Sequence, residues 1–87
     1  MKRRSGFVLQ RIGEDTYAVA VTPESARVGS MVKLNATAAL LFSLLEEEHT
    51  AEECALALTD AYDIDAETAR RDVARFLTAL READLLA

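Results

Sequence analysis

The chain has 87 residues, 51% of them hydrophobic and 29% charged, so it can bury one modest core and is expected to form a single domain over residues 1–87. Its formal net charge of −5 argues against broad binding of a nucleic-acid backbone, which relies on a surplus of Lys and Arg. The longest apolar run, residues 36–42, is far shorter than the roughly 20 residues of a membrane helix. We therefore expect a cytoplasmic protein without a membrane span.

The first part of the chain predicts a β-hairpin. Residues 7–12 alternate weakly between apolar and polar side chains, residues 13–15 form a turn, and residues 16–21 are rich in β-branched and aromatic residues. Residues 1–6 precede the hairpin and carry three basic side chains. We expect this N-terminal segment to be flexible.

A third strand is predicted over residues 28–34, after a segment in which a proline interrupts the extended pattern. On this strand Val32 and Leu34 share one face, and Met31 and Lys33 share the other. A sheet that is covered on one side would bury the first pair.

Two helices follow, each with a recognisable cap. Asn35 is a strong N-cap for a helix over residues 36–45, because its side-chain oxygen can accept from the free amides of the first turn. Thr50 and Glu53 have the spacing of a capping box, which predicts a second helix over residues 51–62.

The third helix is predicted over residues 66–83, with Asp65 as its N-cap. The apolar stripe of this helix consists of Ala69, Val73, Phe76, Leu77 and Leu80. Strands are thus grouped before helices, which is typical of an α+β fold: a three-stranded antiparallel β-meander followed by three helices.

Few residues qualify for catalysis or for metal binding. His49 is the sole histidine and Cys54 the sole cysteine, so the usual zinc ligand sets are unavailable to one chain. We interpret His49 as a solvated loop residue and Cys54 as a small core residue. The glutamates at 46–48, 52 and 53 suit a solvated helix end and a cap better than a cation site. No catalytic residue, metal site or cofactor is therefore predicted.

Several segments occur in an order that is typical of one family. They are Leu34-Asn35-Ala36-Thr37-Ala38, Thr50-Ala51-Glu52-Glu53, Tyr62-Asp63-Ile64-Asp65, residues 72–80 and Ala83-Asp84-Leu85-Leu86. With the opening hairpin, they make nearly the whole chain resemble the PqqD-like family, also called RiPP recognition elements. Where this family usually has Gly, the chain has Asp84, which can also adopt a C-cap conformation.

The resemblance implies a winged-helix-like fold that binds the leader segment of a ribosomally synthesised precursor peptide. Such a module has no catalytic residues and presents the peptide to a modifying enzyme, often a radical SAM protein, or to a leader peptidase. The implied mode is strand addition, in which the leader pairs with the edge of the third strand and its side chains enter a groove beside the third helix. The same exposed edge would allow two copies to pair as a homodimer.

Helical angles suggest where that groove lies. One flank of the apolar stripe carries Arg70, Ala74 and Arg81, and the other carries Asp72 and Ala79. If the cationic flank faces the third strand, the site suits a leader with acidic and apolar side chains. The peptide-binding residues predicted on this basis are Val28, Gly29, Ser30, Met31, Val32, Lys33, Arg70, Ala74, Leu77 and Arg81.

The second interpretation is a winged-helix DNA-binding domain whose third helix lies in a major groove. Four cationic residues of that helix favour it, namely Arg70, Arg71, Arg75 and Arg81. The net charge opposes it, as do four acidic residues of the same helix, namely Glu67, Asp72, Glu82 and Asp84. Each arginine can also belong to a solvated helix face, as Arg71 would if it paired with Glu67 one turn earlier.

Overall fold

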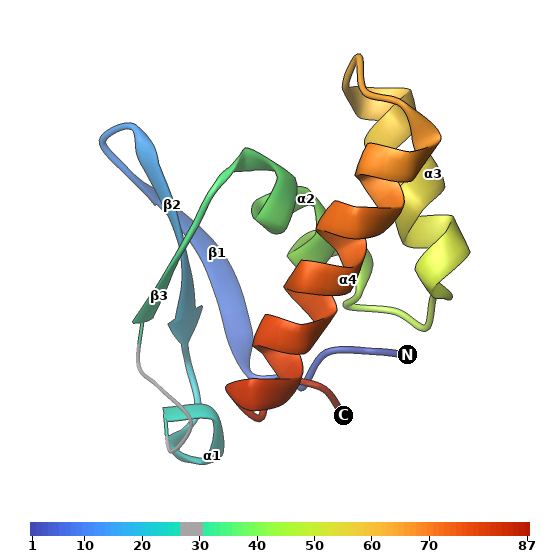
Figure 1. The fold of residues 1–87 in the computed structure, drawn as a ribbon. Coiled ribbons are helices and arrows are strands. Elements are labelled where there is room, and N and C mark those ends of the chain that lie inside the picture. Colours follow the sequence, from blue (N-terminus) through green and yellow to red (C-terminus); the bar gives the residue numbers. More distant parts are fainter. Residues whose placement is uncertain (27–30) are drawn as a thin grey trace.

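The computed structural model describes residues 1–26 and 31–87. Its elements in chain order are β1 (Phe7–Ile12), β2 (Asp15–Ala20), α1 (Pro23–Ala26), β3 (Met31–Leu34), α2 (Ala36–Leu44), α3 (Ala51–Ala61) and α4 (Ala66–Glu82). The three strands form one antiparallel sheet, and α2, α3 and α4 lie together beside it (Figure 1). The predicted α+β class and the order of strands and long helices are confirmed. The short helix α1 was not predicted.

The sheet has the order β1-β2-β3, so β3 lies at an edge. The pairing of Ile12 with Asp15 leaves a two-residue turn between β1 and β2, and Gly13 adopts the positive φ of 65° that such turns require. On β3, the exposure alternates as predicted, because Val32 and Leu34 are half-buried and their neighbours are exposed.

All three predicted helix caps are confirmed. The Asn35 side chain accepts from the N–H of Ala38 at 2.8 Å, and the Asp65 side chain accepts from the N–H of Thr68 at 2.7 Å. The capping box at the start of α3 has both of its hydrogen bonds. Each of the three long helices ends one residue earlier than predicted, because the last predicted residue serves as the C-cap.

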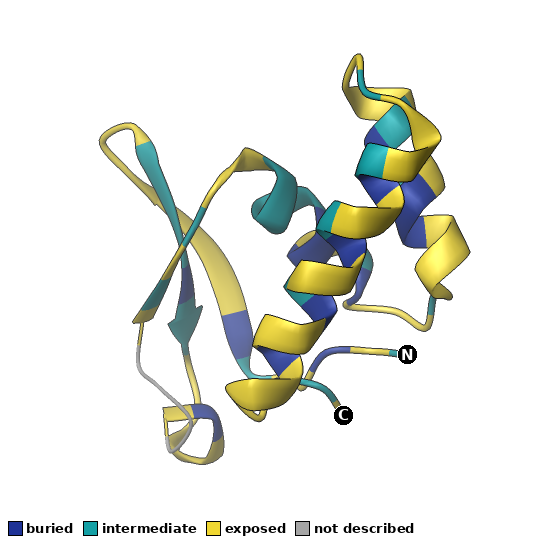
Figure 2. Ribbon diagram, in the orientation of Figure 1, coloured by how far each residue is buried: buried dark blue, intermediate teal, exposed yellow. Residues whose placement is uncertain are grey.

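The core lies where the helices meet one another and the inner face of the sheet (Figure 2). Its largest fully buried side chains are Phe42, Leu41, Leu45, Leu58, Val73 and Cys54. The rings of Phe7 and Phe42 meet edge to face, with their centres 6.1 Å apart, and so join β1 to α2. Cys54 is fully buried, which confirms that it is a core residue, and this burial raises the pKa of its thiol.

The N-terminal residues are packed, in contrast to the flexible basic segment that we expected for residues 1–6. Arg3 forms a β-bridge with Leu86, and its backbone N–H donates to the carbonyl oxygen of Leu45 at 2.8 Å. Only 6% of Arg3 is exposed. An arginine can be buried here because its guanidinium donates to the carbonyl oxygens of Phe42 and Arg4.

Candidate functional site

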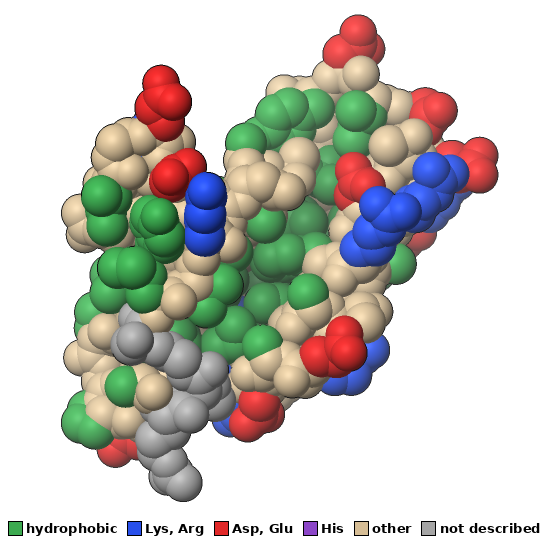
Figure 3. All heavy atoms as spheres, turned by 60° about the vertical axis from the view of Figure 1, so that its left-hand side comes forward, with side chains coloured by type: hydrophobic (Ala, Val, Ile, Leu, Met, Phe, Trp, Pro, Cys, Tyr) green, Lys and Arg blue, Asp and Glu red, His purple; other side chains and the backbone are tan. Residues whose placement is uncertain are grey.

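A hollow with an apolar floor separates β3 from α4. Figure 3 shows it as a depression in which hydrophobic side chains gather between the sheet and the helices. Its volume is about 240 Å³. The residues that line it are Ala18, Val32, Lys33, Leu34, Asn35, Ala38, Phe42, Phe76, Ala79, Leu80, Ala83 and Leu85. We refer to this hollow as the β3–α4 groove.

Local sequence explains the shape of the groove. The inward positions of β3, Val32 and Leu34, form one wall. Phe76 and Ala79 on α4 and its C-cap Ala83 are spaced by three and four residues, so they lie on one side of the helix and form the other wall. Because alanine is small, the two walls stay apart and an extended chain has space between them.

The outer edge of β3 offers backbone hydrogen-bonding groups to a ligand. The N–H of Val21 donates to the carbonyl oxygen of Gly6 at 2.8 Å, which fixes the alternation of hydrogen-bonded pairs in the hairpin. Odd-numbered residues of β2 therefore bond to β1, and even-numbered ones bond to the even-numbered residues of β3. The N–H and C=O groups of Met31 and Lys33 consequently point to the outer edge, where no strand among the described residues pairs with them.

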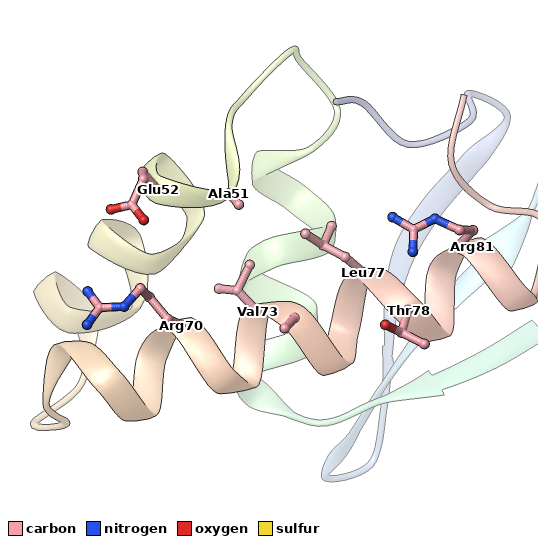
Figure 4. Close-up of a pocket in the computed structure, with 8 residues that line it drawn as sticks. Ala51, Glu52, Arg70, Val73, Leu77, Thr78 and Arg81 are labelled. Carbon is pink, nitrogen blue, oxygen red and sulfur yellow. The ribbon is translucent and has the colours of Figure 1, made fainter.

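The flank of Arg70, Ala74 and Arg81 does not face β3, so the condition on which the sequence placed these residues in the groove is not met. Together with Leu77 these residues line a different cavity, of about 400 Å³, between the start of α3 and α4. Figure 4 shows Arg70, Leu77 and Arg81 projecting from α4 on the side away from β3. The physical reason is the rotation of α4: packing of its buried stripe against α3 turns the opposite flank, which carries Ala79, toward β3.

The other predicted site residues have different outcomes. Val28, Gly29 and Ser30 lie outside the described residues. Met31 and Lys33 are exposed on β3, and Val32 and Lys33 line the groove. Sequence reasoning missed Phe76, which we had assigned to the core although it is half-buried. It also missed Ala79 and Ala83. The signal that could have identified them is the spacing of Phe76, Ala79 and Ala83, in which each residue follows the last by about one helical turn.

Charged side chains lie at the margins of the groove. The Nζ atom of Lys33 is 3.5 Å from Oδ1 of Asp15. At the α2 end, Asp72 and Arg75 line an adjoining hollow of about 290 Å³ that shares Asn35 with the groove. The site is thus apolar in its middle and carries both charge signs around it, which suits a peptide with apolar side chains between polar ones.

The residues that line the groove include no catalytic or metal-binding set of side chains. Within residues 1–26 and 31–87, no group of three His, Cys, Asp or Glu side chains could hold a metal ion. His49 lies in the connection between α2 and α3, with its Nδ1 atom 3.1 Å from the carbonyl oxygen of Glu47, and it does not line the groove. No helix in the described part of the chain is long and apolar enough to cross a membrane. What the groove can do is hold an extended chain against a strand edge.

Comparison with known proteins gives a consistent picture. The family described as coenzyme PQQ synthesis protein D (PqqD) matches residues 6–86. A solved structure described as TbiB1 in complex with the TbiA(beta) leader peptide has 30% sequence identity and a TM-score of 0.75, covering 99% of this chain and 94% of that chain. A second, described as lasso peptide synthetase B1 complexed with the leader peptide, has 26% identity and a TM-score of 0.72, covering 97% and 93%. No curated protein sequence matches significantly.

Proposed function

The chain belongs to the PqqD family, and from this premise we propose that it binds the leader segment of a ribosomally synthesised precursor peptide. The observation that carries the proposal is that the outer edge of β3, which pairs with no strand in the described part of the chain, lies directly beside the β3–α4 groove. Both similar structures described above are complexes with a leader peptide, and each resembles this chain over nearly its whole length.

In the proposed mode, the leader adds to the sheet as a further strand beside β3. Its backbone pairs with the outward N–H and C=O groups of Met31 and Lys33, which supplies affinity without regard to leader sequence. Alternate leader side chains enter the groove and contact Phe76 and Ala79, which supplies specificity. Apolar side chains fit this part of the groove best, because burying an unpaired polar group there would be unfavourable.

We further propose that the chain catalyses no reaction and delivers the bound precursor to a separate enzyme, such as a radical SAM protein or a leader peptidase. The support is that the groove offers a strand edge and apolar surface, and that the residues that line it include no Ser, Thr, Cys, His, Asp or Glu. DNA binding is not favoured, because Arg71 pairs with Glu67 at 3.6 Å and acidic residues alternate with the arginines along α4.

The test is a titration of the isotopically labelled chain with synthetic leader peptides of short precursor genes, which are sought first beside this chain's own gene. Strand addition predicts amide shifts concentrated at residues 31–34, at Phe76 and Ala79 on α4, and at its C-cap Ala83. A scrambled leader of the same composition should shift them much less. Shifts confined to α3, or equal shifts with duplex DNA at the same concentration, would contradict the proposal.

A further inference from the structure

The cavity between α3 and α4 lies on the flank of α4 that faces away from β3, so it is separate from the β3–α4 groove. We call it the α3–α4 cavity; its volume is about 400 Å³. The buried side chains of Val73 and Leu77 form its apolar floor. Figure 4 shows these two side chains between Arg70, at one end of the row, and Arg81, at the other. The cavity is thus apolar in its middle and cationic at both ends.

The two arginines at the ends of the cavity are exposed and have no anionic partner within the described residues. They differ in this respect from Arg71, which pairs with Glu67. Glu52 also lines the cavity, but one carboxylate offsets only one of the two guanidinium groups. A ligand with acidic groups at its ends and an apolar group between them would therefore be complementary to this surface.

The outer face of α3 has this complementary chemistry. Glu52, Leu56 and Asp60 follow one another at intervals of four residues, so they form one row along the exposed side of the helix. We call this row the α3 stripe. At 60%, Leu56 is the most exposed large hydrophobic residue in the described part of the chain. The stripe thus places an uncovered apolar side chain between two carboxylates that form no ion pair with residues 1–26 or 31–87.

The lengths of the stripe and of the cavity agree. Glu52 and Asp60 are eight residues apart, which is about 12 Å along α3, and Leu56 lies midway between them. Arg70 and Arg81 are eleven residues apart, which is about 16 Å along α4. The difference of about 4 Å is shared between two arginine side chains, which are long enough to span it. An α3 stripe therefore fits along the cavity with an acidic group near each arginine.

We propose that the α3–α4 cavity receives the α3 stripe of a second copy of this chain, so that the protein associates as a symmetric dimer. Leu56 of each copy then packs on Val73 and Leu77 of the other. Glu52 belongs to both surfaces, so the stripe and the cavity adjoin, and a single two-fold axis serves both contacts. The β3 edge takes no part in this contact, so the dimer carries two open β3–α4 grooves.

Sedimentation equilibrium of the whole chain measures this association. The two helix surfaces cover only a few hundred Å² on each partner, below the roughly 800 Å² of a stable interface, so we expect a dissociation constant between about 10 μM and 1 mM. Leu56→Ala should weaken the dimer about tenfold or more, because it removes the central apolar side chain. Val21→Ala is the matched control and should stay within about twofold of the wild type, since Val21 is 58% exposed but lies directly after β2.

Charge reversal tests the pairing of the two surfaces. Arg70→Glu with Arg81→Glu makes the cavity acidic, and Glu52→Lys with Asp60→Lys makes the stripe basic. We expect each double variant alone to be monomeric, whereas an equimolar mixture of the two forms a heterodimer, because both contacts then join opposite charges. Net charge alone would give a different result: the second double variant brings the net charge of −5 closer to zero, which by itself favours association.

Circular dichroism checks that each variant is folded, and if a charge-reversed variant is not, the comparison of Leu56→Ala with Val21→Ala decides. A wild type that stays monomeric up to about 1 mM overturns the proposal, as does a mixture of folded double variants that forms no heterodimer. The proposal also fails if the amides of Val73 and Leu77 shift on addition of a leader peptide and not with rising protein concentration, because the cavity would then belong to the leader.

Discussion

The guanidinium carbon of Arg3 lies 4.3 Å from the centre of the Phe42 ring, and its Nε atom donates to the Phe42 carbonyl oxygen at 2.8 Å. One residue of α2 thus holds the arginine both by its ring and by its backbone. Because Phe42 also contacts Phe7 on β1, this pair links the N-terminal segment to the sheet and to the helices. Burial lowers the pKa of Arg3 from its ordinary value, but an arginine remains charged at neutral pH.

Replacing Arg3 should destabilise the fold. We expect Arg3→Ala to lower the free energy of unfolding by about 1–3 kcal/mol, because the Phe42 carbonyl loses its side-chain donor and the ring loses its cation. Arg3→Lys keeps the charge but not the planar guanidinium, so its free energy of unfolding should lie between those of Arg3→Ala and the wild type. Urea denaturation measures both. Lys2→Ala, at an exposed neighbour, is the control and should change stability by less than about 0.5 kcal/mol. An Arg3→Ala protein as stable as the wild type would contradict this interpretation.

The β3 edge gives a backbone-specific prediction. Met31→Pro removes an N–H that points to the outer edge, so it should weaken leader binding about tenfold or more while the pairing of β3 with β2 persists. Met31→Ala changes the same side chain but keeps the N–H, and it should bind the leader within about threefold of the wild type. Fluorescence anisotropy with a labelled leader measures both, and circular dichroism checks the fold. Equal loss in the two variants would mean that the side chain, and not the strand edge, matters.

The contribution of each flank of α4 to leader binding can be compared by making the same alanine-to-phenylalanine change on both. Ala79 and Ala74 are both exposed alanines on this helix, but Ala79 lines the β3–α4 groove and Ala74 lines the cavity beside α3. Ala79→Phe should fill the groove and reduce leader affinity about tenfold or more. Ala74→Phe should leave it nearly unchanged. The opposite ranking would show that the leader binds on the arginine flank.

Asp65 should give the stability a dependence on pH. Its carboxylate accepts the Thr68 N–H at the start of α4, which lowers the pKa of Asp65 below its ordinary value. Because the folded pKa is the lower one, the stabilisation is present above the unfolded pKa of about 3.9 and is lost as the pH falls through the folded pKa. Denaturation between pH 7 and pH 2 measures this loss.

The matched variant is Asp65→Asn, which can still cap the helix but cannot titrate in this range. Its stability should fall less steeply at acidic pH than that of the wild type. Some slope will remain, because the N-terminal ammonium lowers the pKa of Glu48. A wild-type slope in Asp65→Asn would exclude this carboxylate as the cause.

The elements were predictable because their signals are local. Asn35, Thr50 and Asp65 each bond to a backbone group three residues later, so a short stretch of sequence determines where each helix begins. The strand positions of Val32 and Leu34 follow from alternation over only a few residues. The helix α1 depends on local hydrogen bonds too, since the Ser25 N–H donates to the Thr22 hydroxyl and the Ser25 hydroxyl accepts from the Thr22 N–H. A four-residue helix, however, has too few residues to show periodicity.

The groove was only half predictable. The β3 edge follows from strand order, whereas the flank of α4 that faces it depends on how the whole helix packs. Helical angles separate Ala74 from Ala79, but they do not tell which one meets β3, because the rotation of α4 is set by its contacts with α3. Arg3 was missed for a similar reason: its partner Phe42 is 39 residues away in the sequence.

The pairing of the two chain ends has an engineering consequence. The N–H of Ala87 donates to the carbonyl oxygen of Lys2 at 2.8 Å, and Arg3 pairs with Leu86 beside it. A short glycine linker could therefore join the two ends, and new ends could be opened at the exposed turn after Gly13. Such a circular permutant would begin with β2 and finish with β1, yet it would carry the same groove. In this fold, the order in which the chain connects the strands and helices can therefore change while the binding surface stays the same.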